Sequence, residues 1–306
     1  MAPKIILLIG KNGQLARSFI EYSQLLNKNK YVLCAIGRDT LDLETSSEDA
    51  YCKVFNIFKP DLIINAAAFT NVDDAEIKLK TANQVNALSL EIISKECKSR
   101  NIPLIHFSTD YVFDGSGSDH WKVDAITNPI NIYGKSKLTG ENIIKKSGIK
   151  FIIFRISWVF GHGGNNFVES MLNVANKKDL RIVKDQFGGP TSAKSVAISV
   201  IQSIPDIISN NAPNNILKKT FPWGIYHLQG TPVVSRFDFA KEIFLVAYNQ
   251  KIIKKIPNLI PIFSSDYNTP ANRPLNSRLD CQSTIKDLKI KLPLWKEDLK
   301  EYLLKL

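Results

Sequence analysis

The stretch "IILLIGKNGQLARSFI", residues 5–20, decides the fold class. Its apolar start runs straight into Gly10-x-x-Gly13-x-x-Ala16, after which apolar residues recur at helical spacing. Glycines at these positions permit a tight turn and let a pyrophosphate approach the backbone, while the helix that follows offers free N–H groups. The small Ala16 lets that helix pack on the strand. The stretch therefore predicts the first βα unit of a dinucleotide-binding domain, and a tight turn without a ligand is the alternative.

Further apolar runs of strand length follow along the chain. They are continuous rather than alternating, which is typical of parallel strands covered by helices on both faces. The runs are "YVLCAI" (31–36), "DLIIN" (61–65), "IPLIHF" (102–107), "FIIFRI" (151–156) and "GIYHLQ" (224–229). We expect an α/β protein with a Rossmann-type, doubly wound parallel sheet.

The segment 73–101 predicts one or two helices between the third and fourth runs. Its apolar face would contain Val85, Leu88, Ile92 and Ile93, which recur near helical spacing. Asn101 and Pro103 are signals that end a helix.

The pattern loosens after about residue 160, where glycine and proline gather in "GHGGNN" (161–166), "FGGPT" (187–191) and "NAPNN" (211–215). We expect residues 1–161 to form an NAD(P)-binding Rossmann domain to which 181–229 return. Residues 162–180 and 230–306 would then form a smaller α/β substrate-binding lobe at the carboxyl side of the sheet.

Composition narrows the classes of partner. The 306 residues carry 40 Lys+Arg against 29 Asp+Glu, a formal charge of +11, but the lysines are scattered and form no basic arm. This distribution argues against nucleic acid and indicates a solvated surface rich in lysine. The apolar run at the amino terminus is too short for a signal peptide, and no apolar run approaches the length of ~20 residues that spans a bilayer. Cys34, Cys52, Cys97 and Cys281 form no C-x-x-C, so we expect a cytoplasmic protein without a zinc site or disulfides.

The end of the second predicted strand, "AIGRDTLDL", bears on the choice of dinucleotide. Gly37 and Arg38 stand where NAD-binding sites often hold an acidic residue, and an arginine there can receive a 2′-phosphate. We therefore favour NADPH, while Asp39 and Asp42 keep NADH open. Thr70, after the third run, would either cap the next helix or contact the cofactor ribose.

Tyr133 and Lys137 in "YGKSK" are four residues apart, which places both side chains on one face of a helix. A neighbouring ammonium favours the phenolate, so we expect a lowered pKa for Tyr133 and a better acid/base group. Ser108 and Thr109 end the fourth strand, where a hydroxyl can hydrogen-bond a substrate carbonyl. An exposed tyrosine and lysine pair is the alternative reading.

Several longer motifs together carry a resemblance. They are "NAAAFTNVDDAE", "STDYVFDG", "YGKSKLTGE", "FRISWVFG", "GNNFVESML", "DQFGGPT", "RPLNSRLD" and "LPLWKEDLKEYL". In this order, from the first strand to the last helix, the chain resembles the dTDP-4-dehydrorhamnose reductases, a family of extended short-chain dehydrogenases/reductases. The resemblance implies reduction of dTDP-4-dehydro-L-rhamnose to dTDP-L-rhamnose by NAD(P)H, in a pathway that supplies cell-surface polysaccharide.

The resemblance also implies roles for single residues. Thr109, Tyr133 and Lys137 would be catalytic, with Lys137 also holding the nicotinamide ribose. Trp158 would lie against the sugar, Asp110 would face the substrate, and Arg273 and Arg278 would serve the diphosphate or hold the lobe by salt bridges. The positions that correspond to cofactor contacts are Gly10, Gly13, Gln14, Leu15, Arg38, Asp42, Leu43, Ala68, Phe69, Thr70, Tyr133 and Lys137.

The chain departs from the family pattern at two positions, and other activities fit parts of the sequence. The family usually has glycine at Ala16 and often an acidic residue at Gly37, and the second departure favours NADPH. Asp110 is followed by Tyr111 rather than by the second carboxylate of a dehydratase. Another nucleotide-sugar reductase or epimerase, or a non-catalytic NADP-binding regulatory subunit, remains an alternative. A homodimer is possible, and magnesium is possible without support from a carboxylate cluster.

Overall fold

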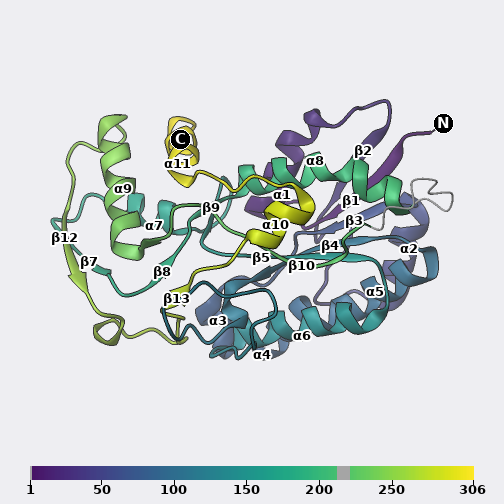
Figure 1. Ribbon diagram of the computed structural model, residues 1–306, viewed down its shortest axis with the longest axis horizontal. Coiled ribbons are helices and arrows are strands. Elements are labelled where there is room, and N and C mark those ends of the chain that lie inside the picture. The colour runs from purple at the N-terminus through teal and green to yellow at the C-terminus, as the bar shows by residue number, and fades with distance from the viewer. Residues whose placement is uncertain (1, 212–220) are drawn as a thin grey trace.

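The computed structural model describes residues 2–211 and 221–306. Its centre is a parallel sheet of six strands in the order β2-β1-β3-β4-β5-β10 (Figure 1). All six predicted runs are strands of this sheet, so the predicted α/β, Rossmann-type class is confirmed. The strands are β1 (Lys4–Ile9), β2 (Tyr31–Ile36), β3 (Leu62–Asn65), β4 (Leu104–Thr109), β5 (Phe151–Ile156) and β10 (Gly224–Leu228).

Apolar side chains cover both faces of the sheet because successive strand residues point to opposite sides. In β1, Ile6 and Leu8 join one buried cluster, whereas Leu7 and Ile9 join the other. Figure 1 shows helices on both sides of the sheet. One side carries α1 (Gln14–Tyr22) and α8 (Ala193–Asn211), and the other carries α2 (Glu48–Phe58), α5 (Ser89–Arg100) and α6 (Ile132–Ser147).

The segment between β3 and β4 is more broken than one or two helices. It forms α3 (Val72–Ile77), α4 (Leu79–Asn83), a π-helical turn (Gln84–Leu88) and α5. A π turn inserts an extra residue and rotates the side chains around it, and Leu88 is accordingly 38% exposed instead of lying on the buried face. The predicted end is confirmed, since Asn101 adopts the left-handed conformation (φ 52°) that follows α5.

The elements after β5 build a smaller region at one end of the molecule, around short sheets (Figure 1). Here β7 pairs with β12, β8 lies between β11 and β13, and β6 pairs with β9. The strands are β6 (Val159–Phe160), β7 (Asp179–Val183), β8 (Phe187–Gly188), β9 (Thr191–Ser192), β11 (Val234–Ser235), β12 (Asn258–Ile262) and β13 (Asn276–Ser277). Its helices are α7 (Phe167–Asn173), α9 (Arg236–Asn249) and α11 (Trp295–Leu304), whereas α10 (Gln282–Leu288) packs against β10 of the large sheet.

The chain crosses between the two regions more than once. Residues 179–192 pair within the small sheets, α8 then packs against α1, and β10 joins the edge of the large sheet. Of the predicted returning segment 181–229, residues 212–220 lie outside the described residues, as does most of "NAPNN". The division into two domains stays a prediction.

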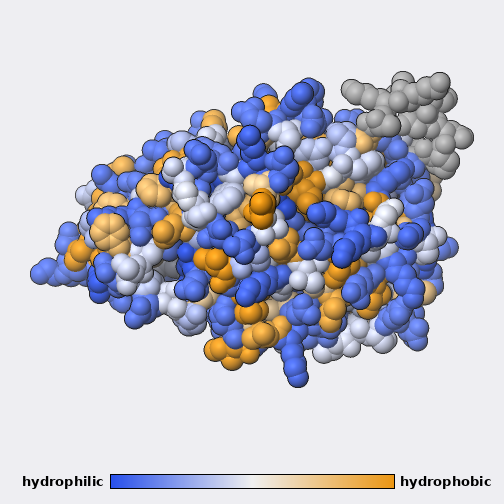
Figure 2. All heavy atoms as spheres, turned by 60° about the horizontal axis from the view of Figure 1, so that its bottom comes forward, coloured by the Kyte–Doolittle hydropathy of each residue, from blue (hydrophilic) through white to orange (hydrophobic). Residues whose placement is uncertain are grey.

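The surface in Figure 2 is largely hydrophilic, with smaller apolar groups between charged and polar residues. This agrees with the scattered lysines of the sequence. None of the helices in residues 2–211 and 221–306 combines the length and apolar character needed to cross a lipid bilayer.

Candidate functional site

A cavity of about 680 Å³ opens at the carboxyl ends of the parallel strands. Ligands of open α/β sheets bind at this edge, where the strand order reverses, here between β1 and β3. The predicted site residues that line the cavity are Gly10, Gly13, Gln14, Leu15, Arg38, Asp42, Leu43, Ala68, Thr70, Thr109, Asp110, Tyr133, Lys137 and Trp158. The structure thus brings most of the predicted residues together on the wall of one cavity.

The glycine turn forms one end of this cavity. Gly10 has φ +102°, and a Cβ there would lie 2.7 Å from the backbone nitrogen of Ala67, so only glycine fits. Gly13 precedes α1 as its N-cap and offers no side chain to the first N–H groups of the helix. A Cβ at Gly13 would meet only the carbonyl oxygen of Gly10, at 3.6 Å. The turn therefore leaves room and backbone donors for a phosphate, which fits a dinucleotide.

Of the charged residues that follow β2, the carboxylates of Asp39 and Asp42 have partners within the protein, whereas Arg38 faces the cavity. Lys11 Nζ lies 2.7 Å from Asp39 Oδ2, and the hydrogen bond from Lys11 lowers the pKa of that carboxyl. Asp42 Oδ1 accepts a hydrogen bond from the backbone N–H of Glu44 at 3.0 Å. Arg38 is exposed and lines the cavity, so its guanidinium is accessible to an anionic ligand.

The loop after β3 is held by a side chain that sequence reasoning missed. Asn86, in the π turn, accepts a hydrogen bond from the Phe69 N–H at 2.8 Å and donates to the Phe69 carbonyl at 3.0 Å. Phe69 itself packs in the core and does not line the cavity. Asn71, not Thr70, caps α3 by accepting from the Asp74 N–H, which leaves Thr70 facing the cavity.

Tyr133 and Lys137 are placed by α6, which begins after the N-cap Asn131. The Asn131 side chain accepts a hydrogen bond from the Gly134 N–H at 2.8 Å. A Cβ at Gly134 would lie 2.2 Å from the Tyr111 carbonyl oxygen, so glycine lets α6 pack directly on the segment after β4. That segment starts with Thr109, and α6 therefore carries its tyrosine to the end of β4.

The ionisation of Tyr133 differs from the expectation. Burial raises the pKa of the phenol, and a hydrogen bond with Thr109 only partly opposes this. The Lys137 ammonium has other partners, since it donates to the Phe107 carbonyl at 2.6 Å and lies 3.1 Å from His106 Nε2. Burial in turn lowers the pKa of Lys137 to about 8. Tyr133 is thus a neutral phenol at neutral pH, the form that can donate a proton.

Asp110 and Ser108 present polar atoms that lack partners among the described residues. Asp110 is 3% exposed, and burial raises the pKa of its carboxyl to about 6. Its Oδ1 accepts from the Thr109 hydroxyl at 3.1 Å, whereas its Oδ2 and the Ser108 hydroxyl are buried without a hydrogen-bond partner. Both residues line the cavity, so a polar ligand would satisfy them.

Of the predicted substrate residues, Trp158 lines the cavity but the two arginines do not. Arg273 Nη2 lies 2.7 Å from Asp73 Oδ2. The Arg278 guanidinium lies over the Phe187 ring at 4.4 Å and donates to Asn276 Oδ1 at 3.0 Å. The arginine that does line the cavity is Arg236, which sequence reasoning missed because a single arginine after a loop gives no signal of its position.

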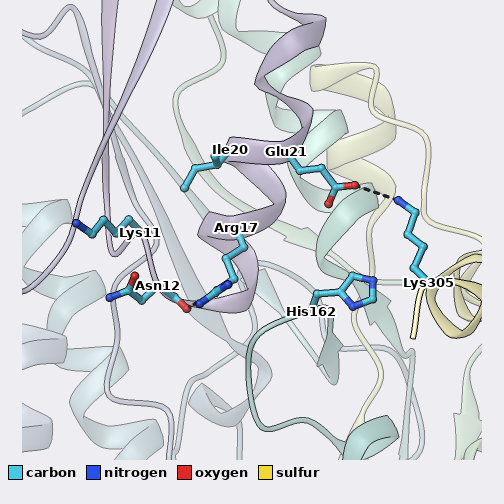
Figure 3. Close-up of a pocket in the computed structure, with 7 residues that line it drawn as sticks. All are labelled: Lys11, Asn12, Arg17, Ile20, Glu21, His162 and Lys305. Carbon is cyan, nitrogen blue, oxygen red and sulfur yellow. Dashed lines mark hydrogen bonds and ion pairs between the residues drawn. The ribbon is translucent and has the colours of Figure 1, made fainter.

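A second hollow, of about 620 Å³, lies beside α1 and the last helix (Figure 3). Its charged groups are largely paired within the protein. Lys305 Nζ lies 3.0 Å from Glu21 Oε1, and Arg17 Nε donates to the Asn12 carbonyl at 3.1 Å. Across residues 2–211 and 221–306, no three His, Cys, Asp or Glu side chains are grouped so that they could hold a metal ion.

Comparison with known proteins agrees with the geometry. The family model "RmlD substrate binding domain" matches residues 4–306. The dTDP-4-dehydrorhamnose reductase of Aggregatibacter actinomycetemcomitans is 38% identical over 96% of this chain and 97% of its own. A crystal structure of a dTDP-4-dehydrorhamnose reductase from Clostridium acetobutylicum superposes with a TM-score of 0.85 at 33% identity, covering 99% of this chain and 100% of that one.

A further solved structure carries a cofactor. The dTDP-4-dehydrorhamnose reductase of Bacillus anthracis, in complex with NADP, has a TM-score of 0.85 at 28% identity, with coverage of 99% and 100%. From the match over nearly its whole length, the chain belongs to the RmlD family of dTDP-4-dehydrorhamnose reductases.

Proposed function

We propose that this protein reduces dTDP-4-dehydro-L-rhamnose to dTDP-L-rhamnose with NAD(P)H, a step that supplies cell-surface polysaccharide synthesis. The observation that carries the proposal is the shared cavity wall. Thr109, Tyr133 and Lys137 lie on the same cavity as the glycine turn, although they come from different parts of the chain. The names of relatives that match nearly the whole chain support the same substrate.

In this proposal each residue has a role that follows from its surroundings. When bound, the nicotinamide cofactor supplies the hydride. Thr109 hydrogen-bonds the C4 ketone, and the neutral Tyr133 phenol donates the proton that the C4 oxygen takes up. Lys137 holds the nicotinamide ribose, and the Phe107 carbonyl and His106 fix its ammonium in place. The predicted substrate contacts at Asp110, Trp158, Arg273 and Arg278 remain hypotheses for mutagenesis.

NADPH is the cofactor we favour. Arg38 lines the cavity as an exposed cation, and the carboxylate of Asp39 is drawn to Lys11. An arginine in this place can bind a 2′-phosphate, and the Bacillus anthracis relative was solved with NADP. Leu43 and Asp42 would then lie on the adenine side.

The finer organisation is part of the proposal. We infer a cofactor domain of residues 1–161 with 181–229, and a substrate lobe of residues 162–180 and 230–306. A cytoplasmic site of action suits the four cysteines, which are all free in the structure. A homodimer stays a prediction, which sedimentation velocity would test.

The test is oxidation of NADPH and of NADH with dTDP-4-dehydro-L-rhamnose generated in place, followed by nicotinamide absorbance. We expect turnover by the wild type and a loss of kcat of about 100- to 10,000-fold in Tyr133→Phe. Tyr248→Phe, at an exposed tyrosine of α9 away from the cavity, is the matched control and should keep its rate. A folded wild type that binds NADPH but oxidises neither NADPH nor NADH with this substrate would refute the proposed reductase activity. The search would then turn to another keto sugar or to a regulatory role.

A further inference from the structure

Arg236 stands apart from the other residues of the cavity wall. It is the first residue of α9, and its backbone N–H donates to the Gln186 carbonyl at 3.0 Å. Every other described residue that lines the cavity lies between Ile9 and Asn165. Arg236 is therefore the contribution of the later chain to the wall of the site.

Two aromatic rings hold the Arg236 guanidinium. Its central carbon lies 3.7 Å from the centre of the Trp158 ring and 4.9 Å from that of Phe167. Trp158 itself has φ 47°, a left-handed conformation that is rare for a bulky residue and points to a specific demand on its position. A guanidinium that lies over an aromatic ring can still donate hydrogen bonds from its N–H edges.

The charge of Arg236 has no carboxylate partner within 4.0 Å among the described residues. The buried Arg155 shows the usual arrangement, since its guanidinium lies 2.8 Å from Glu141 Oε2. Burial lowers the pKa of Arg236 to about 10, which still leaves it charged at neutral pH, while the neighbouring Tyr111 and Asp110 favour the charged form. A partly buried cation without a direct ion pair is stabilised when a ligand supplies the opposite charge.

The neighbours of Arg236 indicate which ligand that is. Asp110 and Tyr111 follow β4, and Trp158 follows β5, so the guanidinium lies at the chemical end of the cavity. The glycine turn that would receive the cofactor pyrophosphate follows β1, two strands away from β4. A nucleotide sugar, the substrate class of the proposed function, carries one anionic group, the diphosphate that joins nucleoside and sugar.

We propose that Arg236 binds the diphosphate of the nucleotide-sugar substrate, and that Trp158 and Phe167 are positioning residues that orient its guanidinium. The proposal rests on the proposed function for the identity of the sugar, but not for the binding of the diphosphate. It also changes the part played by Trp158, because Arg236 covers one face of the indole that was expected to lie against the sugar.

The experiment measures dTDP binding by titration calorimetry on the full chain, together with NADPH binding and the unfolding temperature. In Arg236→Gln we expect the Kd for dTDP to rise about 10- to 100-fold, the loss typical of a charge-assisted hydrogen bond, with the Kd for NADPH unchanged. Arg236→Lys keeps the charge without the planar fork and should lie between the two. Arg181→Gln removes an exposed guanidinium of β7 outside the cavity and serves as the matched control.

Steady-state kinetics distinguish a residue that orients Arg236 from one that only stabilises the fold. Phe167→Leu should raise the KM for the keto sugar about threefold and leave kcat and the Kd for NADPH unchanged, because only the orientation of Arg236 is loosened. A loss of NADPH affinity in Arg236→Gln with dTDP affinity kept would assign Arg236 to the cofactor and overturn the proposal. An unchanged dTDP affinity in a folded Arg236→Gln protein would overturn it as well.

Failure of the proposed function gives a different result. In that case the wild type would bind dTDP in an Arg236-dependent way but would not turn over dTDP-4-dehydro-L-rhamnose. If Arg236→Gln does not fold, the calorimetry of Arg236→Lys and Phe167→Leu decides, and wild-type affinity for dTDP in both would overturn the proposal.

Discussion

The two ends of the cavity are built by different means. The cofactor end depends on backbone shape within one continuous stretch, where Gly10 and Gly13 leave space and α1 presents N–H groups. The chemical end depends on side chains that arrive from β4, α6, the β5–β6 connection and α9. At Gly10 the first end has no room for an added Cβ, whereas the second end depends on the charges of its buried side chains.

Burial explains this difference. At the chemical end, desolvation raises the pKa of Asp110, lowers that of Lys137 and lowers that of His106 well below its usual range. At the cofactor end, Arg38 and Asp39 are exposed to solvent. Binding energy at the first end therefore comes from fit, and reactivity at the second comes from groups kept away from water.

The largest effect is expected where a side chain would enter the glycine turn. Gly10→Ala places a Cβ 2.7 Å from the Ala67 nitrogen at a positive φ, and should cost about 4 kcal/mol of folding free energy from strain and overpacking together. Gly13→Ala should leave stability almost unchanged, because its Cβ meets only the Gly10 carbonyl oxygen, at 3.6 Å. The variant should nevertheless bind NADPH more weakly, because Gly13 lines the cavity. Urea unfolding and NADPH titration measure the two quantities.

Gly117→Ala is the control for backbone strain, since Gly117 has φ +68° with nothing within 4 Å of a Cβ. It should be destabilised much less than Gly10→Ala. Equal losses in the two variants would mean that the contact with Ala67 contributes nothing, and the account of the turn as a close-packed cradle would be wrong.

A smaller effect is expected at the chemical end, where folding stability should depend on pH through Asp110. The pKa of Asp110 is about 6 in the fold against an ordinary 3.8, so the folded state binds more protons between these values. The stabilisation from protonated Asp110 is full below pH 3.8 and is lost as pH rises through about 6. Relative to wild type, Asp110→Asn should therefore gain about 2 kcal/mol in stability between pH 4 and pH 7.

Urea unfolding of both proteins at the two pH values measures this difference. Asp114→Asn is a control at a partly exposed carboxyl whose pKa is lowered by hydrogen bonds from Ser116, and its stability relative to wild type should move in the opposite direction. A difference between Asp110→Asn and wild type that does not change with pH would show that Asp110 is not desolvated.

The smallest expected effect concerns the exposed cation of the cofactor end. Arg38→Gln should raise the KM for NADPH roughly tenfold and leave that for NADH unchanged, because only NADPH carries the 2′-phosphate. Arg181→Gln again controls for loss of a surface charge. Equal changes for both cofactors would place Arg38 away from the 2′-position and reopen NADH as the preferred reductant.

Sequence patterns predicted the strands of the large sheet, and the motifs and the resemblance together pointed to many of the residues that line the cavity. Six largely apolar runs predicted the six strands, because parallel strands covered by helices on both faces favour apolar residues at successive positions. The break of the helical segment at the π turn was missed, since the apolar residues Val85, Leu88, Ile92 and Ile93 also fit an uninterrupted helix. The pKa of Tyr133 was predicted in the wrong direction because spacing reports nearness to Lys137 but neither the depth of burial nor the other partners of the ammonium.

The sequence by itself indicated the fold class, the glycine turn and the placement of Tyr133 and Lys137 on one helix, because each is visible in residue patterns along short stretches of the chain. Only the tertiary structure decided that Arg236 enters the cavity while Arg273 pairs with Asp73, and that Asn86 holds the loop at Phe69. Such contacts join segments from 17 to 200 positions apart. Their geometry is set by how whole helices and strands pack, which local residue preferences do not encode.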